Sequence, residues 1–329
     1  MDYDINGPIN FFRLEHNKKI IYIFIDMLVD YNNVTDCSLI SNPLNKSIDI
    51  DQFLINFLKN SKESIDFFLP SSHQKNKTIL NKREIYIDQI IKLPSIINMK
   101  NINFIYREDA HGVDDKKNIQ KLMKIASSYD TFFTIYNNNI DNIIFDMKKI
   151  LKYIKKIMKI KFILRFNFKT EDYLSNVKKN INELINLLES NKENLIYGKN
   201  EKQFFELQSK IYNLLFIITN SIYFICGIIY NSSNINSILK NDNKTIIYFP
   251  YMYALNLIHI LVKYFDFKIT DRFFSDPFID KESIKELNKI IKDLDMNYES
   301  LLFMEKIFIY KNKDDKIIQC INFVNIQMN

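Results

Sequence analysis

The chain has 329 residues, of which 47% are apolar and 26% are charged, the balance of a globular protein that can bury a sizeable core. It has only four glycines and no tryptophan, while isoleucine, asparagine and lysine are abundant, as codons of an AT-rich genome would give. Phosphate-binding loops need glycine where the backbone takes a positive φ or approaches a ligand. Because the sequence contains no GxGxxG or GxxxxGK[ST] motif, a P-loop or standard Rossmann site is not expected.

The net charge is +6, from 45 basic and 39 acidic residues that are mixed along the chain. A nucleic-acid binder usually concentrates basic charge on one face, so nucleic acid is not the expected partner. The densest basic stretch, Lys148–Lys161, places lysines between isoleucines in the pattern of an amphipathic helix. We interpret it as a solvated helix face, and the alternative is a surface for an anionic partner such as nucleic acid or lipid headgroups.

The three cysteines, Cys37, Cys226 and Cys320, are odd in number and widely spaced. This spacing predicts neither a disulfide framework nor a CxxC metal site, and free thiols suit a reducing, intracellular setting. The N-terminal segment MDYDINGPINFF lacks the basic start and apolar core of a signal peptide.

In the first half of the chain, short apolar runs alternate with segments of helical spacing. The expected strands are Ile20–Ile25, Ile65–Leu69, Ile102–Tyr106 and Phe162–Phe168. The expected helices between them are Asp51–Asn60, Arg83–Ile97, Asp114–Ser128 and Asn139–Met158. Strands separated by helices predict an α/β fold with a central, largely parallel sheet.

The second half is expected to be rich in helix. Helices are predicted over Thr170–Glu189, Lys202–Tyr230, Tyr253–Phe265 and Asp280–Leu294, with a strand at Lys244–Phe249 and a closing hairpin formed by Lys306–Tyr310 and Ile317–Phe323. Without a linker that marks a boundary, we divide the chain into a sheet-forming part, 1–170, and a helix-rich part, 171–329, that completes the same domain.

One stretch of the second half, residues 211–239, carries no charged residue, and Leu214–Ile229 within it is mostly apolar. Its length approaches the roughly 20 residues of a membrane span. Polar residues such as Asn213 and Asn220 lie inside it, and polar groups are costly at the bilayer centre. A buried central helix is the favoured interpretation, and a membrane anchor near 211–230 is the alternative.

Candidate catalytic residues are few. The four histidines form no HxH or HxxxH ligand pair, and His259 lies in an apolar helix pattern typical of a core residue. His111 follows a predicted strand in the segment Arg107–Gly112, where Glu108 and Asp109 could orient its imidazole or share a cation. A polar loop is the simpler interpretation. The alternative is a metal-dependent hydrolase whose site joins these three residues to Asp26, at the end of the first predicted strand.

The order of these motifs resembles an uncharacterised family of giant-virus (nucleocytoplasmic large DNA virus) proteins, which is distantly similar to the EreA/ChaN-like hydrolases. In that family, a Gly-acid-x-His motif, an Asp-x-Phe-x-Glu strand, an Asn-Val-Arg-Phe-His-Tyr-x-Asp strand and a Tyr-x-Gly-x-x-His strand end follow one another. Here the corresponding segments are FIDML at 24–28, DFFLP at 66–70, NINFIYRE at 101–108 and YFPYMY at 248–253.

The polar residues of these motifs are largely replaced. Asp26, Asp66 and Glu108 retain an acid, but the positions of the three histidines and of one glutamate hold Leu28, Ile105, Tyr253 and Pro70. Loss of one member of a catalytic unit already costs orders of magnitude in rate. The resemblance therefore implies a lost site, with no catalytic residue, metal or cofactor.

We accordingly expect a catalytically inactive α/β protein of a large DNA virus, acting as a structural or interaction component, in the virion or in the cytoplasm of the infected host cell. Its expected partners are other viral proteins, including capsid or virion components, and a second copy of the chain is an alternative partner.

Overall fold

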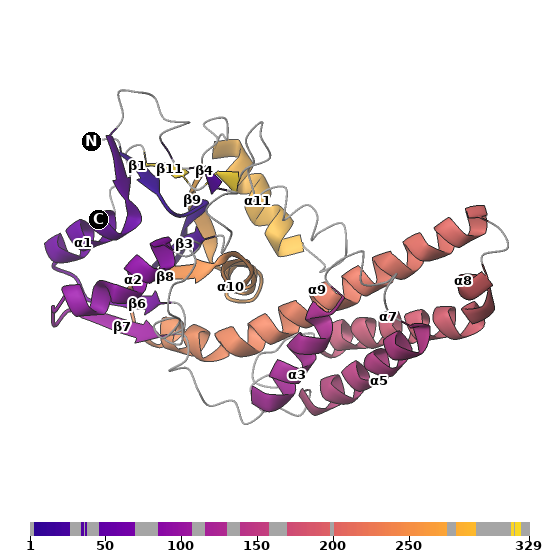
Figure 1. Cartoon of the computed structure of the whole chain (residues 1–329). Helices are drawn as coiled ribbons and strands as arrows, with labels where there is room; N and C mark the ends of the chain where they lie inside the picture. Colours follow the sequence, from indigo (N-terminus) through magenta and orange to yellow (C-terminus); the bar gives the residue numbers. More distant parts are fainter. Residues whose placement is uncertain are drawn as a thin grey trace. The chain divides into compact units, whose positions relative to one another are not determined.

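The fold comes from a computed structural model of the whole chain (Figure 1). It describes residues 3–26, 34–35, 37, 46–69, 85–106, 116–129, 139–157, 170–197, 201–274, 281–293, 317–318 and 320–323. The chain divides into two compact units. The first comprises Met1–His111, Tyr230–Leu294 and Leu302–Asn329, and the second comprises Gly112–Ile229 and Asp295–Leu301.

A six-stranded sheet forms the centre of the first unit, with the strand order β7-β6-β8-β3-β2-β9. The neighbours from β7 to β3 are parallel to one another, and β2 is antiparallel to both β3 and β9. In order, these strands are Ile102–Tyr106, Ile65–Leu69, Lys244–Pro250, Lys19–Asp26, Asn10–His16 and Lys268–Phe274. The predicted α/β class with a largely parallel sheet is confirmed.

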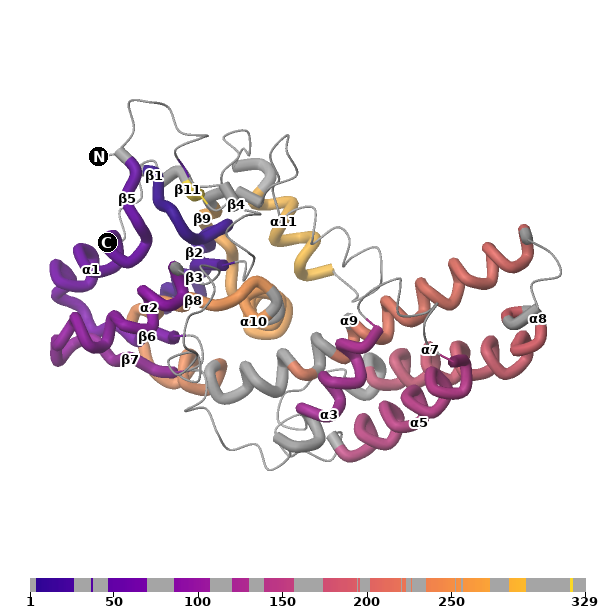
Figure 2. The backbone as a smooth tube through the Cα atoms, viewed as in Figure 1, coloured from indigo at the N-terminus to yellow at the C-terminus, as the bar shows by residue number. Residues whose placement is uncertain are grey.

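The four parallel strands are the ones that the apolar runs of the sequence predict. The residues of β6, β8 and β3 are buried on both faces, which is why these strands are nearly continuous apolar runs, whereas the edge strand β7 is only partly buried. The strand β8 comes from the second half of the chain, yet it pairs with β3 on one side and β6 on the other. Figure 2 shows this placement by colour, with orange β8 beside indigo β3.

Two helices cover one face of this sheet. They are α1 (Ile50–Asn60), which packs against α2 (Ile85–Ile96). Their apolar sides join alternate residues of the strands, including Tyr22, Phe24 and Tyr248, in one buried cluster. The opposite face is contacted by α10 (Tyr251–Tyr264), which packs against α11 (Lys281–Asp293).

A second, three-stranded sheet has the order β11-β1-β5, made of Cys320–Phe323, Tyr3–Asn6 and Lys46–Asp49. A two-stranded pair joins β10 (Ile317–Ile318) to β4 (Val34–Thr35). The strands β10 and β11 lie within the predicted hairpin segment Ile317–Phe323, and they pair with the N-terminal strands β4 and β1. The segment 306–310 lies outside the described residues.

Cys37 and Cys320 form a disulfide bond, with their Cα atoms 5.0 Å apart, so the prediction of no disulfide is wrong. Asn6 explains how the two cysteines meet. It lies opposite Cys320 in the β1–β11 pair, and its Oδ1 accepts a hydrogen bond of 3.0 Å from the backbone N–H of Cys37. The inference of a reducing setting, which rested on free thiols, loses that basis. Cys226 is free and buried, and burial raises the pKa of its thiol to about 12.

The described part of the second unit is helical. It contains α3 (Lys116–Ser127), α5 (Ile140–Ile157), α7 (Thr170–Ser190), α8 (Lys192–Tyr197) and the first part of α9 (Glu201–Lys240). The helix α5 packs against α3 and α7, and it buries one apolar stripe formed by Ile143, Met147, Ile150 and Ile154. The expected strand at Phe162–Phe168 lies outside the described residues.

The apolar stretch Leu214–Ile229 lies within α9, which is 40 residues long. Buried side chains such as Leu215, Ile218 and Ile222 recur along it at helical spacing. None of the helices in the described ranges combines the length and the apolar character of a membrane span.

Candidate functional site

The carboxyl ends of the parallel strands are where active sites of α/β proteins gather, and Asp26 closes β3 at this edge. Its side chain is on the face that α1 and α2 cover, because Tyr22 and Phe24 alternate with it along the strand. Asp26 is 4% exposed. This strand end therefore presents an almost fully buried carboxylate, the one acid of the compared motifs that the structure describes at this edge.

Tyr248, on the neighbouring strand β8, donates a hydrogen bond of 2.5 Å from its hydroxyl to Oδ2 of Asp26. Both residues are buried. Burial raises the pKa of Tyr248 well above its usual value, and the charge of Asp26 and the hydrogen bond to it raise this pKa further. Tyr248 consequently stays protonated and acts as a permanent donor to the carboxylate.

The beginnings of α1 and α2 close the same edge. Asp51, in the first turn of α1, and Tyr86, in the first turn of α2, both act electrostatically on Tyr248. Gly7 lies between them, with a φ of +122°, and a Cβ atom there would be 2.8 Å from Cγ2 of Ile50 and 3.0 Å from the Tyr86 ring. A side chain at position 7 would clash with these two residues, so the packing here requires glycine.

Asp66 lies at the other end of the sheet, because it is the second residue of β6. Its two oxygens accept hydrogen bonds from the side-chain amides of Asn103, at 3.1 Å, and Asn241, at 3.3 Å. Lys19, at the start of β3, donates to the backbone carbonyls of Asn241 and Asn243. Desolvation lowers the pKa of Lys19, while the nearby charge of Asp66 raises it. This polar group fastens the loop before β8 to the sheet.

The other described residues at the motif positions of the resembled family do not lie near Asp26. Ile105 lies on β7 and points to the opposite face, since its neighbours Phe104 and Tyr106 contact the cluster under α1 and α2. Tyr253 is half-buried in the first turn of α10. Five further predicted positions lie outside the described residues, namely Leu28, Pro70, Glu108, Asp109 and His111. In the described part of the chain, no three His, Cys, Asp or Glu side chains are grouped as metal ligands would be.

His259 is a core residue of α10, 2% exposed, as its apolar surroundings in the sequence indicate. Burial lowers the pKa of its imidazole to about 3, the charge of Lys263 lowers it as well, and a backbone hydrogen bond with Ile291 opposes this shift.

The burial of His259 makes the free energy of unfolding depend on pH in the acid range. The unfolded chain binds a proton at His259 near pH 6.5, whereas the folded chain does so only near pH 3. The stability that the buried, neutral His259 contributes is therefore complete above about pH 6.5 and is lost progressively as the pH falls toward 3. We expect the unfolding free energy to fall by about 2 kcal/mol between about pH 7 and pH 5 through this residue. Urea unfolding of the wild type and of His259→Leu measures the effect as the difference between their pH profiles. Parallel profiles would contradict it.

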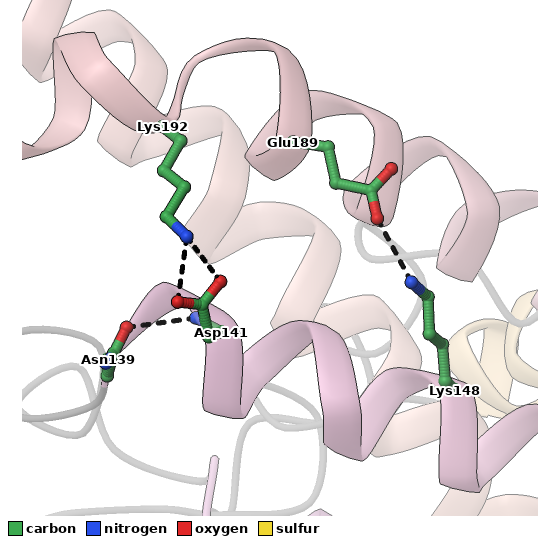
Figure 3. Close-up of polar contacts among 5 residues, drawn as sticks. All are labelled: Asn139, Asp141, Lys148, Glu189 and Lys192. Atoms are coloured by element: carbon green, nitrogen blue, oxygen red, sulfur yellow. Dashed lines mark hydrogen bonds and ion pairs between the residues drawn. The ribbon is translucent and has the colours of Figure 1, made fainter.

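In the helical unit, polar contacts fix α5 against its neighbours (Figure 3). Asn139 begins α5, because its Oδ1 accepts a hydrogen bond of 3.1 Å from the backbone N–H of Asp141. Asp141 pairs with Lys192 of α8 at 2.6 Å, and Lys148 pairs with Glu189 of α7 at 3.1 Å. These are exposed pairs that contribute roughly 0.2–1 kcal/mol each, so they align the helices more than they stabilise them.

An open groove also lies along α7. It is lined by Ser175, Lys178, Lys179, Asn182, Glu183, Asn186, Leu187 and Ser190. This lining is polar, of mixed charge and contributed by a single helix, and it contains neither histidine nor cysteine. It lacks the convergent acid, base and nucleophile of a catalytic site.

Two mimivirus proteins are similar to this chain. It is 24% identical over 215 residues to "Uncharacterized protein R706" of Acanthamoeba polyphaga mimivirus, a match that covers 58% of this chain and 45% of that protein. It is 38% identical over 72 residues to "Uncharacterized protein R129" of the same virus, over 20% of this chain and 39% of that protein. The chain thus spans less than half the length of each of these relatives.

No protein-family profile matches the chain, and no solved structure does. The expected similarity to the EreA/ChaN-like hydrolases is therefore not supported. The sequence matches support the resemblance to giant-virus proteins, since the chain is similar to two uncharacterised proteins of a giant virus.

Proposed function

We propose that this chain is a giant-virus protein without catalytic activity that acts as a structural or interaction component of the virion. The observation that carries the proposal is the state of Asp26. Its carboxylate lies where an α/β hydrolase would hold a catalytic acid, yet it is 4% exposed and accepts a short hydrogen bond from Tyr248.

A catalytic carboxylate must reach the substrate or a metal-bound water. Asp26 instead accepts a hydrogen bond from the buried Tyr248, and the raised pKa of Tyr248 prevents this phenol from acting as a base near neutral pH. Tyr248 thus satisfies Asp26 by a hydrogen bond within the fold. This arrangement favours a structural role for Asp26, in keeping with a site that has lost its histidines.

The helical unit supports the interaction role. Its helix α5 presents a long exposed face in addition to the stripe that it buries, and large apolar side chains are exposed at Phe145 on α5 and Phe205 on α9. Exposed aromatic side chains are common at sites where proteins bind partners. The giant-virus origin of both relatives is the basis for placing the partners in the virus particle.

Two measurements on the purified chain test the absence of catalysis. We expect no stoichiometric Zn or Mn by elemental analysis, and no turnover of ester or phosphoester substrates above that of an Asp26→Asn variant. Stoichiometric metal together with turnover that Asp26→Asn abolishes would overturn the proposal. If turnover is lost instead in His111→Ala, whose fold is checked by circular dichroism, the site lies in the 108–111 segment.

The virion role has its own test. Quantitative mass spectrometry of purified virus particles should find the chain at a constant ratio to the capsid proteins, and cross-linking should identify its neighbours. A chain confined to the soluble fraction of infected cells, and absent from particles, would rule this role out.

A further inference from the structure

The lysines of the helical unit are concentrated on α3 and α5, although basic and acidic residues are mixed along the whole sequence. The helix α3 carries four lysines and no acidic residue. The helix α5 carries five lysines and two aspartates, and both aspartates are engaged by other groups. Asp141 pairs with Lys192, while Asp146 accepts a hydrogen bond from Tyr129 and pairs with Lys149. Because α3 and α5 pack together, this pair of helices carries an excess of positive charge.

The exposed face of α5 is defined by five residues: Phe145, Lys148, Lys152, Lys155 and Lys156. They lie on the side of the helix opposite its buried stripe, spread over about three turns at 3.6 residues per turn. Lys148 is partly neutralised by Glu189. Among the described residues, no carboxylate pairs with Lys152, Lys155 or Lys156, and these three side chains are exposed.

Phe145 stands among these lysines. It is 58% exposed, and the ammonium group of Lys149 lies 4.1 Å from the centre of its ring. An aromatic ring beside a row of cations is the combination with which proteins bind single-stranded nucleic acid. The cations contact phosphates, and a base stacks on the ring.

We propose that this exposed face of α5 binds single-stranded nucleic acid. Lys152, Lys155 and Lys156 contact the phosphates, and Phe145 stacks on a base. A duplex fits less well, because its bases are stacked on one another and the face has no arginine to read their edges.

An anionic membrane fits less well too. An interfacial helix must insert an apolar face into the lipid, and the apolar face of α5 is buried within the helical unit. The inference is independent of the proposed lack of catalysis, since it concerns a different unit of the chain.

The first test neutralises the lysines. Binding of a fluorescently labelled single-stranded 20-mer of deoxythymidine is followed by anisotropy over a range of salt concentrations. We expect K152Q/K155Q/K156Q to bind at least about tenfold more weakly at low salt, and the slope of log K against log salt to decrease by about 2. The matched control is K285Q/K289Q/K292Q, which removes the same charge from exposed lysines of α11. It should bind like the wild type.

The second test removes the ring. Phe145→Ala should weaken binding by roughly fivefold or more without changing the salt slope, since stacking releases no counterions. Phe205→Ala, which truncates the exposed ring on α9, is the matched control and should have no effect.

Four results would overturn the proposal: no binding by the wild type at low salt, equal losses in the two lysine variants, unchanged affinity of Phe145→Ala, or preference for a 20-base-pair duplex. Vesicles of phosphatidylserine and phosphatidylcholine are tested in parallel. Sedimentation of the chain with these vesicles, without binding to the oligonucleotide, would assign the face to lipid instead.

Discussion

Replacing Cys37 and Cys320 together by serine is expected to lower the free energy of unfolding by about 4 kcal/mol. The bond links residues that are 283 positions apart in sequence. A cross-link of this length removes much of the conformational freedom of the unfolded chain, and the entropic gain increases with loop length. Urea unfolding followed by far-ultraviolet circular dichroism measures the change, because the chain has no tryptophan to serve as a fluorescent probe.

The reductant dithiothreitol supplies the control. It should shift the wild type to the stability of the double variant and leave the double variant unchanged. The Cys226→Ala variant should lose stability in dithiothreitol as the wild type does, since the thiol of Cys226 is not part of the disulfide. If Cys37 and Cys320 are both alkylated in the folded, untreated protein, the bond does not form and the prediction is wrong.

Tyr248→Phe is expected to destabilise the first unit by about 3 kcal/mol, because it leaves the buried carboxylate of Asp26 without this donor. Tyr22→Phe is a matched control on the adjacent strand. Tyr22 is also fully buried, but its hydroxyl has no hydrogen-bond partner among the described residues, so its removal should be neutral or slightly stabilising. Equal losses in the two variants would show that the Asp26–Tyr248 bond contributes nothing specific.

The same pair predicts an alkaline limit to stability. The pKa of Tyr248 is raised on folding, so its contribution is complete below the unfolded pKa of about 10 and decreases as the pH rises above it. The wild type should therefore lose stability faster than Tyr248→Phe above about pH 10, and the gap between them should narrow. A constant gap from neutral to alkaline pH would contradict the assignment of Tyr248 as the titrating group.

The strands and helices that the sequence predicts well are those with a strong local pattern. The apolar run of β3 and the amphipathic spacing of α5 and α7 are examples, and the structure has each of them within one or two residues of the predicted bounds. The strands β2 and β9 were not predicted, since NFFRLEH and KITDRFF interrupt their apolar residues with charge. Their pairing with each other, about 260 residues apart, makes them strands.

At the candidate site, too, the sequence predicts what depends on local pattern and misses what depends on pairing between distant segments. That Asp26 ends a parallel strand follows from local sequence, and so does the separate position of Asp66. That Tyr248 satisfies Asp26 does not follow, because the two are 222 residues apart and the neighbours of a strand cannot be read from its own sequence. The disulfide is also a product of tertiary contact, whereas the lysine face of α5 follows from the local amphipathic spacing. For the Asp26–Tyr248 pair and the disulfide, the sequence supplies the residues, and the strand order and helix packing decide which of them meet.

The central place of β8 has a consequence for synthesis on the ribosome. The strands β6 and β3 are made early, but they are not neighbours, and β8 must enter between them from about 175 residues further along the chain. Until it does, two half-sheets expose unpaired edges of isoleucine and phenylalanine, which readily pair with other chains. We therefore expect the nascent chain to depend on chaperones, and truncation before Lys244 to yield aggregates that chaperone depletion makes worse.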